Sequence, residues 1–298
     1  MILLTGATGF IGSHTARTLR ERGLSVRALV RSGADTSALK ALEVDLVVGH
    51  LDDKASLVRA CTGVDAIVHL VGIIRELPPT VTFERIHVEG TRNLLAAATE
   101  AGVRKFVYIS AIGSRPDAIA RYHQTKWATE ALVRSSGLTW VILRPSVVFG
   151  PGDEFINLLA NDLVRKPPFI PVIGPGTNKL QPLWVKDLAE VIARCTTSSS
   201  FDGRILEVGG PEQLSLHEIL ALLARHLRVR KPFVSIPIAL VQPAVALGSA
   251  IAPQLLPITA DQLTMLQEDN ITAERPFSGE LRMPLTDLAT GIREYLQN

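Results

Sequence analysis

The chain has 298 residues, of which 47% are hydrophobic, and its 31 basic and 29 acidic residues leave a formal net charge of +2. This length fits two modest domains or one large α/β domain with an appended lobe. The charges are spread along the chain, which argues against a nucleic-acid-binding protein. Cys61 and Cys195 lie far apart and outside any metal-ligand spacing, so we expect two buried free thiols and no metal.

Short runs rich in Val and Ile alternate with longer segments of helical periodicity in the first half of the chain. Strands are expected at residues 2–4, 26–30, 46–48, 66–70, 106–109 and 141–143, and helices at 11–22, 54–61, 83–101 and 119–135. This alternation predicts an α/β fold, a Rossmann-type doubly wound parallel sheet.

A second region begins after Gly150, where prolines become frequent and a regular alternation cannot continue. A helix at 186–195 and a strand at 204–208 are expected to return to the sheet. We therefore predict an NAD(P)-binding Rossmann domain at 1–150, with returns near 181–209. Residues 151–180 and 210–298 would form a smaller C-terminal lobe for substrate or partner.

Residues 233–260 carry no charged side chain and are long enough to span a bilayer. Prolines at 237, 243, 253 and 257 interrupt the segment, which argues against a spanning helix. An apolar substrate lobe or a membrane-facing surface remains. Since the first glycine turn arrives by Gly6, we expect no signal peptide and a cytoplasmic protein, or one peripheral to the inner face of a membrane.

A glycine-spaced turn, G-x-x-G-x-x-G, follows the first predicted strand and opens a helix. Without Cβ atoms, backbone N–H groups and the positive end of the helix can face a pyrophosphate. The residues expected to contact the cofactor here are Gly6, Thr8, Gly9, Phe10, Ile11 and Gly12. A tight turn without a ligand is the alternative.

The second strand ends in Arg31 and Ser32, where NAD-selective sites normally carry an acid for the adenosine ribose. Arg31 with Ser32 could form charge-assisted bonds to a 2′-phosphate, which favours NADP(H) over NAD(H). The alternative is a solvated surface arginine.

Two further loops follow predicted strands. Leu51 and Asp52 lie where an adenine edge could be met, although Asp52 or Asp53 could equally cap the next helix. Leu70, Val71 and Gly72 end the fourth strand, and Gly72 would let the chain pass close to a dinucleotide. His69 is expected to be a hydrogen-bonded core histidine.

Tyr122 and Lys126 are four residues apart on a predicted helix and so share one face. An ammonium near a phenol favours the phenolate, so we expect a lowered tyrosine pKa. Such a phenol could exchange protons near neutral pH. The position after the fifth strand strengthens a pattern that is weak in isolation.

With these residues in place, the chain resembles the extended short-chain dehydrogenase/reductase superfamily, in its NAD-dependent epimerase/dehydratase-like form. The stretches that carry the resemblance, besides T-G-A-T-G-F-I-G and Y-x-x-x-K, are residues 64–70, 90–95, 144–152 and 184–189. The resemblance implies that Tyr122 is the acid/base, that Lys126 binds the nicotinamide ribose, and that Pro145 and Val148 line the nicotinamide.

Three positions depart from the family pattern. Ile112 stands where a Ser or Thr is expected, His87 replaces the asparagine of N-x-x-G-T, and the acid after the second strand is missing. Ser110 is still expected to touch the cofactor. The combination resembles an atypical branch that includes the nucleotide-binding accessory subunit of respiratory complex I.

Two functions follow from these features. The first is an NADP(H)-dependent oxidoreductase or epimerase-like enzyme, with Tyr122 exchanging a proton with a hydroxyl or carbonyl of a small, apolar or sugar-nucleotide substrate. The second is a non-catalytic NADPH-binding structural or sensing subunit associated with a respiratory membrane complex. A true sugar-nucleotide epimerase would hold NAD, which Arg31 argues against.

Overall fold

The structure is a computed structural model that describes residues 1–251, 258–273, 280 and 283–297. The chain divides into two compact units. The first unit consists of Met1–Arg144 and Val185–Leu206, and the second of Pro145–Trp184 and Glu207–Asn298.

The first unit is built on a seven-stranded sheet with the strand order β11-β6-β5-β4-β1-β2-β3. Its elements are β1 (Ile2–Thr5), α1 (Phe10–Glu21), β2 (Val26–Val30), α2 (Ser37–Ala41), β3 (Asp45–Val48), α3 (Lys54–Cys61), β4 (Ala66–His69), the π-helical turn η1 (Glu84–Glu89), α4 (Gly90–Glu100), β5 (Lys105–Ile109), α5 (Arg121–Arg134), β6 (Thr139–Pro145), α7 (Val185–Thr197), the 3₁₀ turn η3 (Ser199–Phe201) and β11 (Arg204–Val208). Strands β1 to β6 pair in parallel, with Ile2 opposite Val26 on one side and Ala66 on the other.

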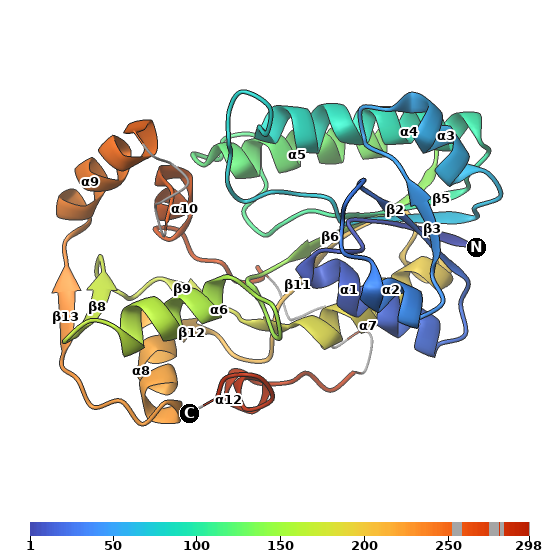
Figure 1. The fold of residues 1–298 in the computed structure, drawn as a ribbon. Coiled ribbons are helices and arrows are strands. Elements are labelled where there is room, and N and C mark those ends of the chain that lie inside the picture. The colour runs from blue at the N-terminus through green and yellow to red at the C-terminus, as the bar shows by residue number, and fades with distance from the viewer. Residues whose placement is uncertain (252–257, 274–279, 281–282, 298) are drawn as a thin grey trace. The chain divides into compact units, whose positions relative to one another are not determined.

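Helices cover both faces of this sheet: α3, α4 and α5 lie on one face, and α1 and α7 pack together on the other (Figure 1). The strand order reverses between β1 and β4, which is the position where dinucleotides bind in doubly wound sheets. The predicted Rossmann-type α/β fold is therefore confirmed. Both cysteines are buried and free, as expected.

The core of the first unit explains why these segments become strands. Leu3, Ile67, Phe106 and Ile142 come from four neighbouring strands and are fully buried in one apolar cluster, to which Leu94 of α4 also belongs. Strands covered on both faces read as continuous apolar runs in the sequence. One difference is the segment predicted as a single helix over 83–101, which begins as the π-helical turn η1 before α4.

The second unit contains short elements around its own apolar core. They are β7 (Val148–Phe149), α6 (Phe155–Leu158), the π-helical turn η2 (Leu159–Arg165), β8 (Ile170–Ile173), β9 (Lys179–Leu180), β10 (Leu183–Trp184), β12 (Leu214–Ser215), α8 (Leu216–His226), β13 (Phe233–Ile236), α9 (Ile238–Ile251), α10 (Ala260–Met265) and α12 (Leu288–Ile292). The strands form the pairs β7–β10, β9–β12 and β8–β13. Phe149, Trp184 and Leu220 are among the side chains of this core.

Helix α9 corrects one expectation about the uncharged segment. Pro243 lies inside the helix and does not end it, whereas positions 253 and 257 lie outside the described residues. At 14 residues the helix is about 21 Å long. Among the described residues, none of the helices has the length and apolar character needed to cross a membrane.

Candidate functional site

The glycine turn after β1 is shaped by close backbone approaches. Gly6 adopts a φ of 76°, and a Cβ there would lie 3.0 Å from the Leu70 carbonyl carbon and the Val71 nitrogen. A Cβ on Gly12 would lie 2.0 Å from the Gly6 carbonyl oxygen. Glycine is required at both positions, because a side chain on Gly12 would push α1 away from the turn, and one on Gly6 would crowd the loop after β4 in a backbone conformation that L-residues rarely adopt.

Helix α1 begins directly from this turn. Its N-cap is Gly9, and no side chain accepts a hydrogen bond from the first turn. Phe10 and Ile11 are half-buried in that turn, while Thr8 and Gly9 are exposed beside it. The first N–H groups of the helix can therefore bind an anion such as a pyrophosphate, together with the positive end of the helix dipole. These residues fit the dinucleotide that the sequence predicts.

The loop after β4 lies close to both the glycine turn and helix α5. Its first part, at Leu70 and Val71, meets Gly6. At its other end, a Cβ on Gly72 would lie 3.6 Å from His87 Nε2 and 3.9 Å from Lys126 Nζ. One short loop thus passes close to both the phosphate-binding turn and the helix that carries Tyr122.

His69 ends β4 below this loop and is buried. Its Nδ1 lies 2.6 Å from the Thr5 hydroxyl and its Nε2 lies 2.9 Å from the Thr91 hydroxyl. Burial lowers the pKa of His69 to about 3, so the ring is neutral. The prediction of a hydrogen-bonded core histidine is confirmed.

The end of β2 presents Arg31 and Ser32 as exposed side chains, followed by Gly33 with a φ of 78°. Near the glycine turn, a cavity of about 250 Å³ is lined by Thr8, Ser13, His14 and Arg17 of one segment and by Asp35 and Ser37 of another. Arg17 is exposed on α1. Arg17 was not among the residues predicted from the sequence, although its position five residues after Gly12 on the same helix was a signal for it.

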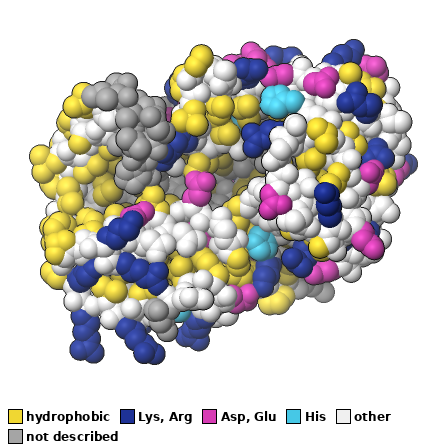
Figure 2. Space-filling view, viewed as in Figure 1, with side chains coloured by type: hydrophobic (Ala, Val, Ile, Leu, Met, Phe, Trp, Pro, Cys, Tyr) yellow, Lys and Arg dark blue, Asp and Glu magenta, His cyan; other side chains and the backbone are white. Residues whose placement is uncertain are grey.

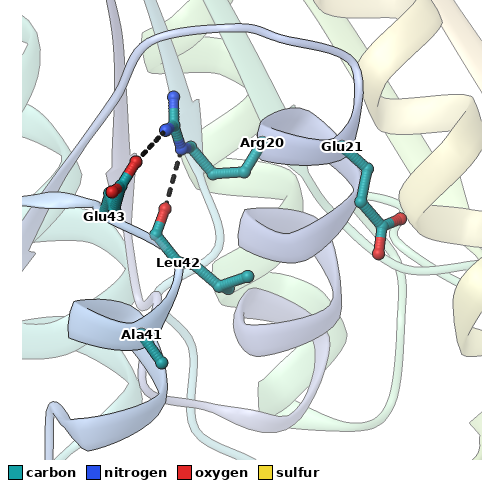
Figure 3. A pocket seen from close by; sticks show the side chains of 5 residues that line it. All are labelled: Arg20, Glu21, Ala41, Leu42 and Glu43. Carbon is teal, nitrogen blue, oxygen red and sulfur yellow. Dashed lines mark hydrogen bonds and ion pairs between the residues drawn. The ribbon is translucent and has the colours of Figure 1, made fainter.

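A second hollow, of about 240 Å³, lies between α1 and α2 and is shown in Figure 3. Its arginine is already engaged, because Arg20 donates from Nε to the Leu42 carbonyl at 2.8 Å and its Nη2 lies 3.4 Å from Glu43 Oε2. These bonds tie the end of α1 to the end of α2. We assign the hollow a structural role.

The loop after β3 shows which of its two acids caps the next helix. Asp53 caps α3 by accepting a hydrogen bond from the Ser56 amide, and this bond lowers the carboxyl pKa. Asp52 instead pairs with Arg85, whose Nη2 is 2.7 Å from the carboxylate. The Leu51 side chain is buried in the core, and its carbonyl accepts from Asn93 Nδ2 at 3.0 Å.

Tyr122 and Lys126 both lie on α5, near the loop after β4. Tyr122 packs its ring edge-on against His87, with centroids 5.6 Å apart. Lys126 is buried, donates to the Ile109 carbonyl at 2.5 Å and lies 4.5 Å from the centre of the Tyr108 ring.

The expected lowering of the tyrosine pKa is wrong for this structure. Burial raises the pKa of Tyr122 to about 12. Burial also lowers the pKa of Lys126 to about 7, although the carboxylate of Glu130 opposes this. The sequence revealed the pairing of the two side chains but not the desolvation that dominates both.

His87 joins three elements around Tyr122. Its Nε2 accepts a hydrogen bond from the Ile73 amide at 3.0 Å, so the ring proton lies on Nδ1 and is directed to the Thr125 hydroxyl, also 3.0 Å away. Thr125 in turn donates to the Tyr122 carbonyl at 2.9 Å. His87 therefore fixes the loop after β4 against α5, in the position where the family has asparagine.

Replacing His87 with Asn should change how stability depends on pH. Burial, with a smaller contribution from Lys126, lowers the pKa of His87 to about 2, far below that of an unfolded histidine. Below about pH 6.5 the His87 ring binds a proton in the unfolded chain but stays neutral in the folded one. Stability therefore falls as pH falls, by about 1.4 kcal/mol per pH unit. We expect the free energy of unfolding, measured by urea denaturation between pH 6.5 and 4.5, to fall less steeply with decreasing pH in His87→Asn, by about 1.4 kcal/mol per pH unit. The two slopes should coincide above pH 7, and equal slopes below it would contradict the assignment.

A buried carboxylate lies beneath the end of β5. Glu130 accepts from the Ser110 hydroxyl at 2.6 Å and from Arg144 in a bidentate pair at 2.8 and 2.7 Å. The Ser110 hydroxyl, which we expected at the cofactor, is thus directed to Glu130. Ile112 is only 4% exposed and provides no hydroxyl.

Pro145 and Val148, the two residues implied for the nicotinamide, belong to the second unit. Pro145 is the last residue of β6 and is buried, and Val148 pairs with Leu183 between β7 and β10. Within the described part of the chain, His, Cys, Asp and Glu side chains form no group of three or more that could hold a metal ion.

The fold and the glycine turn together define a dinucleotide-binding protein of the Rossmann type. The sequence profile described as NAD(P)H-binding matches residues 6–156, just over half of the chain, and the chain belongs to this family. The resemblance inferred from the motifs is thereby confirmed at the level of the family.

Three curated relatives are reductases or a respiratory subunit. The chain is 33% identical to a ceramide reductase of Caulobacter vibrioides over 66% of its own length and 61% of that protein. It is 30% identical to an NAD(P)H azoreductase of Xenophilus azovorans, covering 75% and 73% of the two chains. It is 24% identical to the 40 kDa subunit of the Neurospora crassa NADH-ubiquinone oxidoreductase, covering 98% and 78%.

Among solved structures, gox2253 covers 99% of this chain and 98% of its own, with a TM-score of 0.79 and 26% identity. The alignment to the ceramide reductase spans about three fifths of that relative. The chain is therefore an NAD(P)H-binding, oxidoreductase-like protein.

Proposed function

We propose that the chain is an NADP(H)-dependent reductase that delivers a proton from Tyr122 to a carbonyl of its substrate. The observation that carries this proposal is the course of the loop after β4, which passes close to the glycine turn at Gly6 and close to Lys126 at Gly72. A dinucleotide whose pyrophosphate lies on the turn would extend along this loop toward α5. When bound, the nicotinamide would supply the hydride.

The protonation state of Tyr122 is consistent with a role as proton donor. With its pKa raised to about 12, Tyr122 keeps its proton at neutral pH and has one to give to a carbonyl oxygen. Lys126 donates to Ile109 and would use its remaining protons toward the nicotinamide ribose, as the resemblance implies. His87, through Thr125, holds the backbone of Tyr122 in place.

A non-catalytic NADPH-binding subunit is the second candidate. It is favoured by Ile112, which removes a hydroxyl donor that the extended enzymes place near the reacting oxygen, and by the similarity to a respiratory complex subunit. One hydrogen bond of this kind can be worth a few kcal/mol in the transition state. Binding of NADPH without turnover of any carbonyl acceptor would support this candidate.

The cofactor preference is tested by Arg31→Ala. Losing charge-assisted bonds to the 2′-phosphate should weaken NADPH binding about tenfold to a hundredfold and leave NADH binding unchanged. Titration calorimetry with both cofactors measures this difference. Arg17→Ala belongs in the same series, because Arg17 lines the cavity beside Thr8. If Arg17→Ala alone lowers NADPH affinity, the 2′-phosphate lies against α1, and the assignment to Arg31 is wrong.

A further inference from the structure

Helix α9 of the second unit exposes an apolar stripe. Leu240 and Leu247 are 70% and 64% exposed. Together with the exposed Ala244 they occupy positions i, i+4 and i+7, which lie on one face of a helix. Val245 is buried on another side. Helices of globular proteins normally turn leucines toward the core, so this helix has a second apolar face that is in contact with solvent.

The neighbouring strand extends this surface. Phe233 and Val234 of β13 are exposed, and β13 pairs with β8 within the second unit. Figure 2 shows hydrophobic side chains gathered over the region of β13 and α9, with several Lys and Arg side chains below them. We call the exposed residues Phe233, Val234, Leu240, Ala244 and Leu247 the apolar face.

The charged side chains that directly precede the apolar face along the chain are all basic. From residue 219 to residue 260 the chain has no Asp or Glu, and the next acid is Asp261, at the start of α10. Four basic residues, Arg225, Arg228, Arg230 and Lys231, precede the face directly. Arg228 and Arg230 are exposed, whereas Lys231 donates to the Val164 and Arg165 carbonyls.

We propose that the apolar face docks on an anionic lipid bilayer, with Leu240 and Leu247 entering the boundary between headgroups and acyl chains and the arginines contacting lipid phosphates. An uncharged helix preceded by a cluster of basic residues is suited to this position, because apolar burial and attraction to anionic lipid add together. A second copy of the chain on the same face would bring two arginine clusters together, which like charges oppose. This docking goes beyond the proposed reductase activity and is independent of it.

The test is co-sedimentation of the purified full chain with vesicles of phosphatidylcholine alone or mixed with phosphatidylglycerol. The chain should bind the mixed vesicles, and less at high salt. Leu240→Glu/Leu247→Glu should weaken this binding at least tenfold, because two apolar side chains lose their burial. Arg228→Gln/Arg230→Gln should weaken it about fivefold per charge removed.

Val48→Glu is the matched control, since Val48 is 58% exposed on the first unit and should leave vesicle binding unchanged. The melting temperatures of all variants should stay close to that of the parent, because the changed side chains are exposed. Absence of binding by the folded parent, or full binding by the leucine variant, overturns the proposal. If the leucine change instead converts a dimer to a monomer in light scattering, the face belongs to a second copy, and the proposal also fails.

Discussion

Replacing Tyr122 with Phe should lower the rate of NADPH-dependent carbonyl reduction by about 10²- to 10⁴-fold, the usual contribution of a positioned acid. The phenyl ring keeps its edge contact with His87, whose centroid lies 5.6 Å away, so the local packing is retained. Affinity for NADPH should change little. The loss would lie in turnover, measured as NADPH oxidation with a panel of ketones and quinones.

Tyr295→Phe provides the control for this experiment. This change removes a tyrosine hydroxyl from the second unit, where Tyr295 donates to Asp153 at 2.6 Å. It should leave turnover near the parent level. If Tyr122→Phe turns over as fast as the parent, Tyr122 is not the acid. If no acceptor is reduced by the parent although NADPH binds, the non-catalytic function replaces the proposed one.

The first unit could be predicted well from the sequence, because its strands, turns and helix ends are marked by patterns of neighbouring residues. Buried parallel strands such as β4 read as apolar runs, and the glycines of the turn mark the close approaches that the structure shows at Gly6 and Gly12. Helix α3 was predicted at its observed bounds, since Asp53 and Gly63 mark its two ends.

The second unit was harder to predict, although the start of α8 had a local signal. The pattern Ser215-x-x-Glu218 is a capping box at the start of α8, and the structure contains both of its hydrogen bonds. The two-residue strands of this unit, such as β7 and β10, depend on pairing between distant segments and have too little length for any periodicity. Helix α2, with five residues, was missed for the same reason.

The chemistry of the site was predicted in part. Spacing alone placed Tyr122 and Lys126 on one helix, but burial sets their pKa values, and burial depends on packing from β5, η1 and the loop after β4. The contact between His87 and Ile73 joins residues of two elements and could not be read from the helix pattern. Glu130 was overlooked because its partner Arg144 lies on a different element, β6.

Glu130→Gln should destabilise the protein by about 3–5 kcal/mol, because it removes one partner of a buried ion pair and leaves the other charge uncompensated. The Glu130 side chain is 0% exposed and that of Arg144 is 15% exposed. The Ser110 hydroxyl would lose its charged acceptor as well. Urea denaturation at neutral pH measures the change in the free energy of unfolding.

The exposed pair of Lys54 and Glu100 is the matched control, since Glu100→Gln should cost less than about 1 kcal/mol. The double change Glu130→Gln/Arg144→Met should recover much of the lost stability, because it removes the unpaired charge along with its partner. Equal losses for Glu130→Gln and Glu100→Gln would show that the buried pair does not hold α5 to β6. In that case the hydrogen bonds from His87 to Thr125 and from Thr125 to the Tyr122 carbonyl would hold Tyr122 and Lys126 in position.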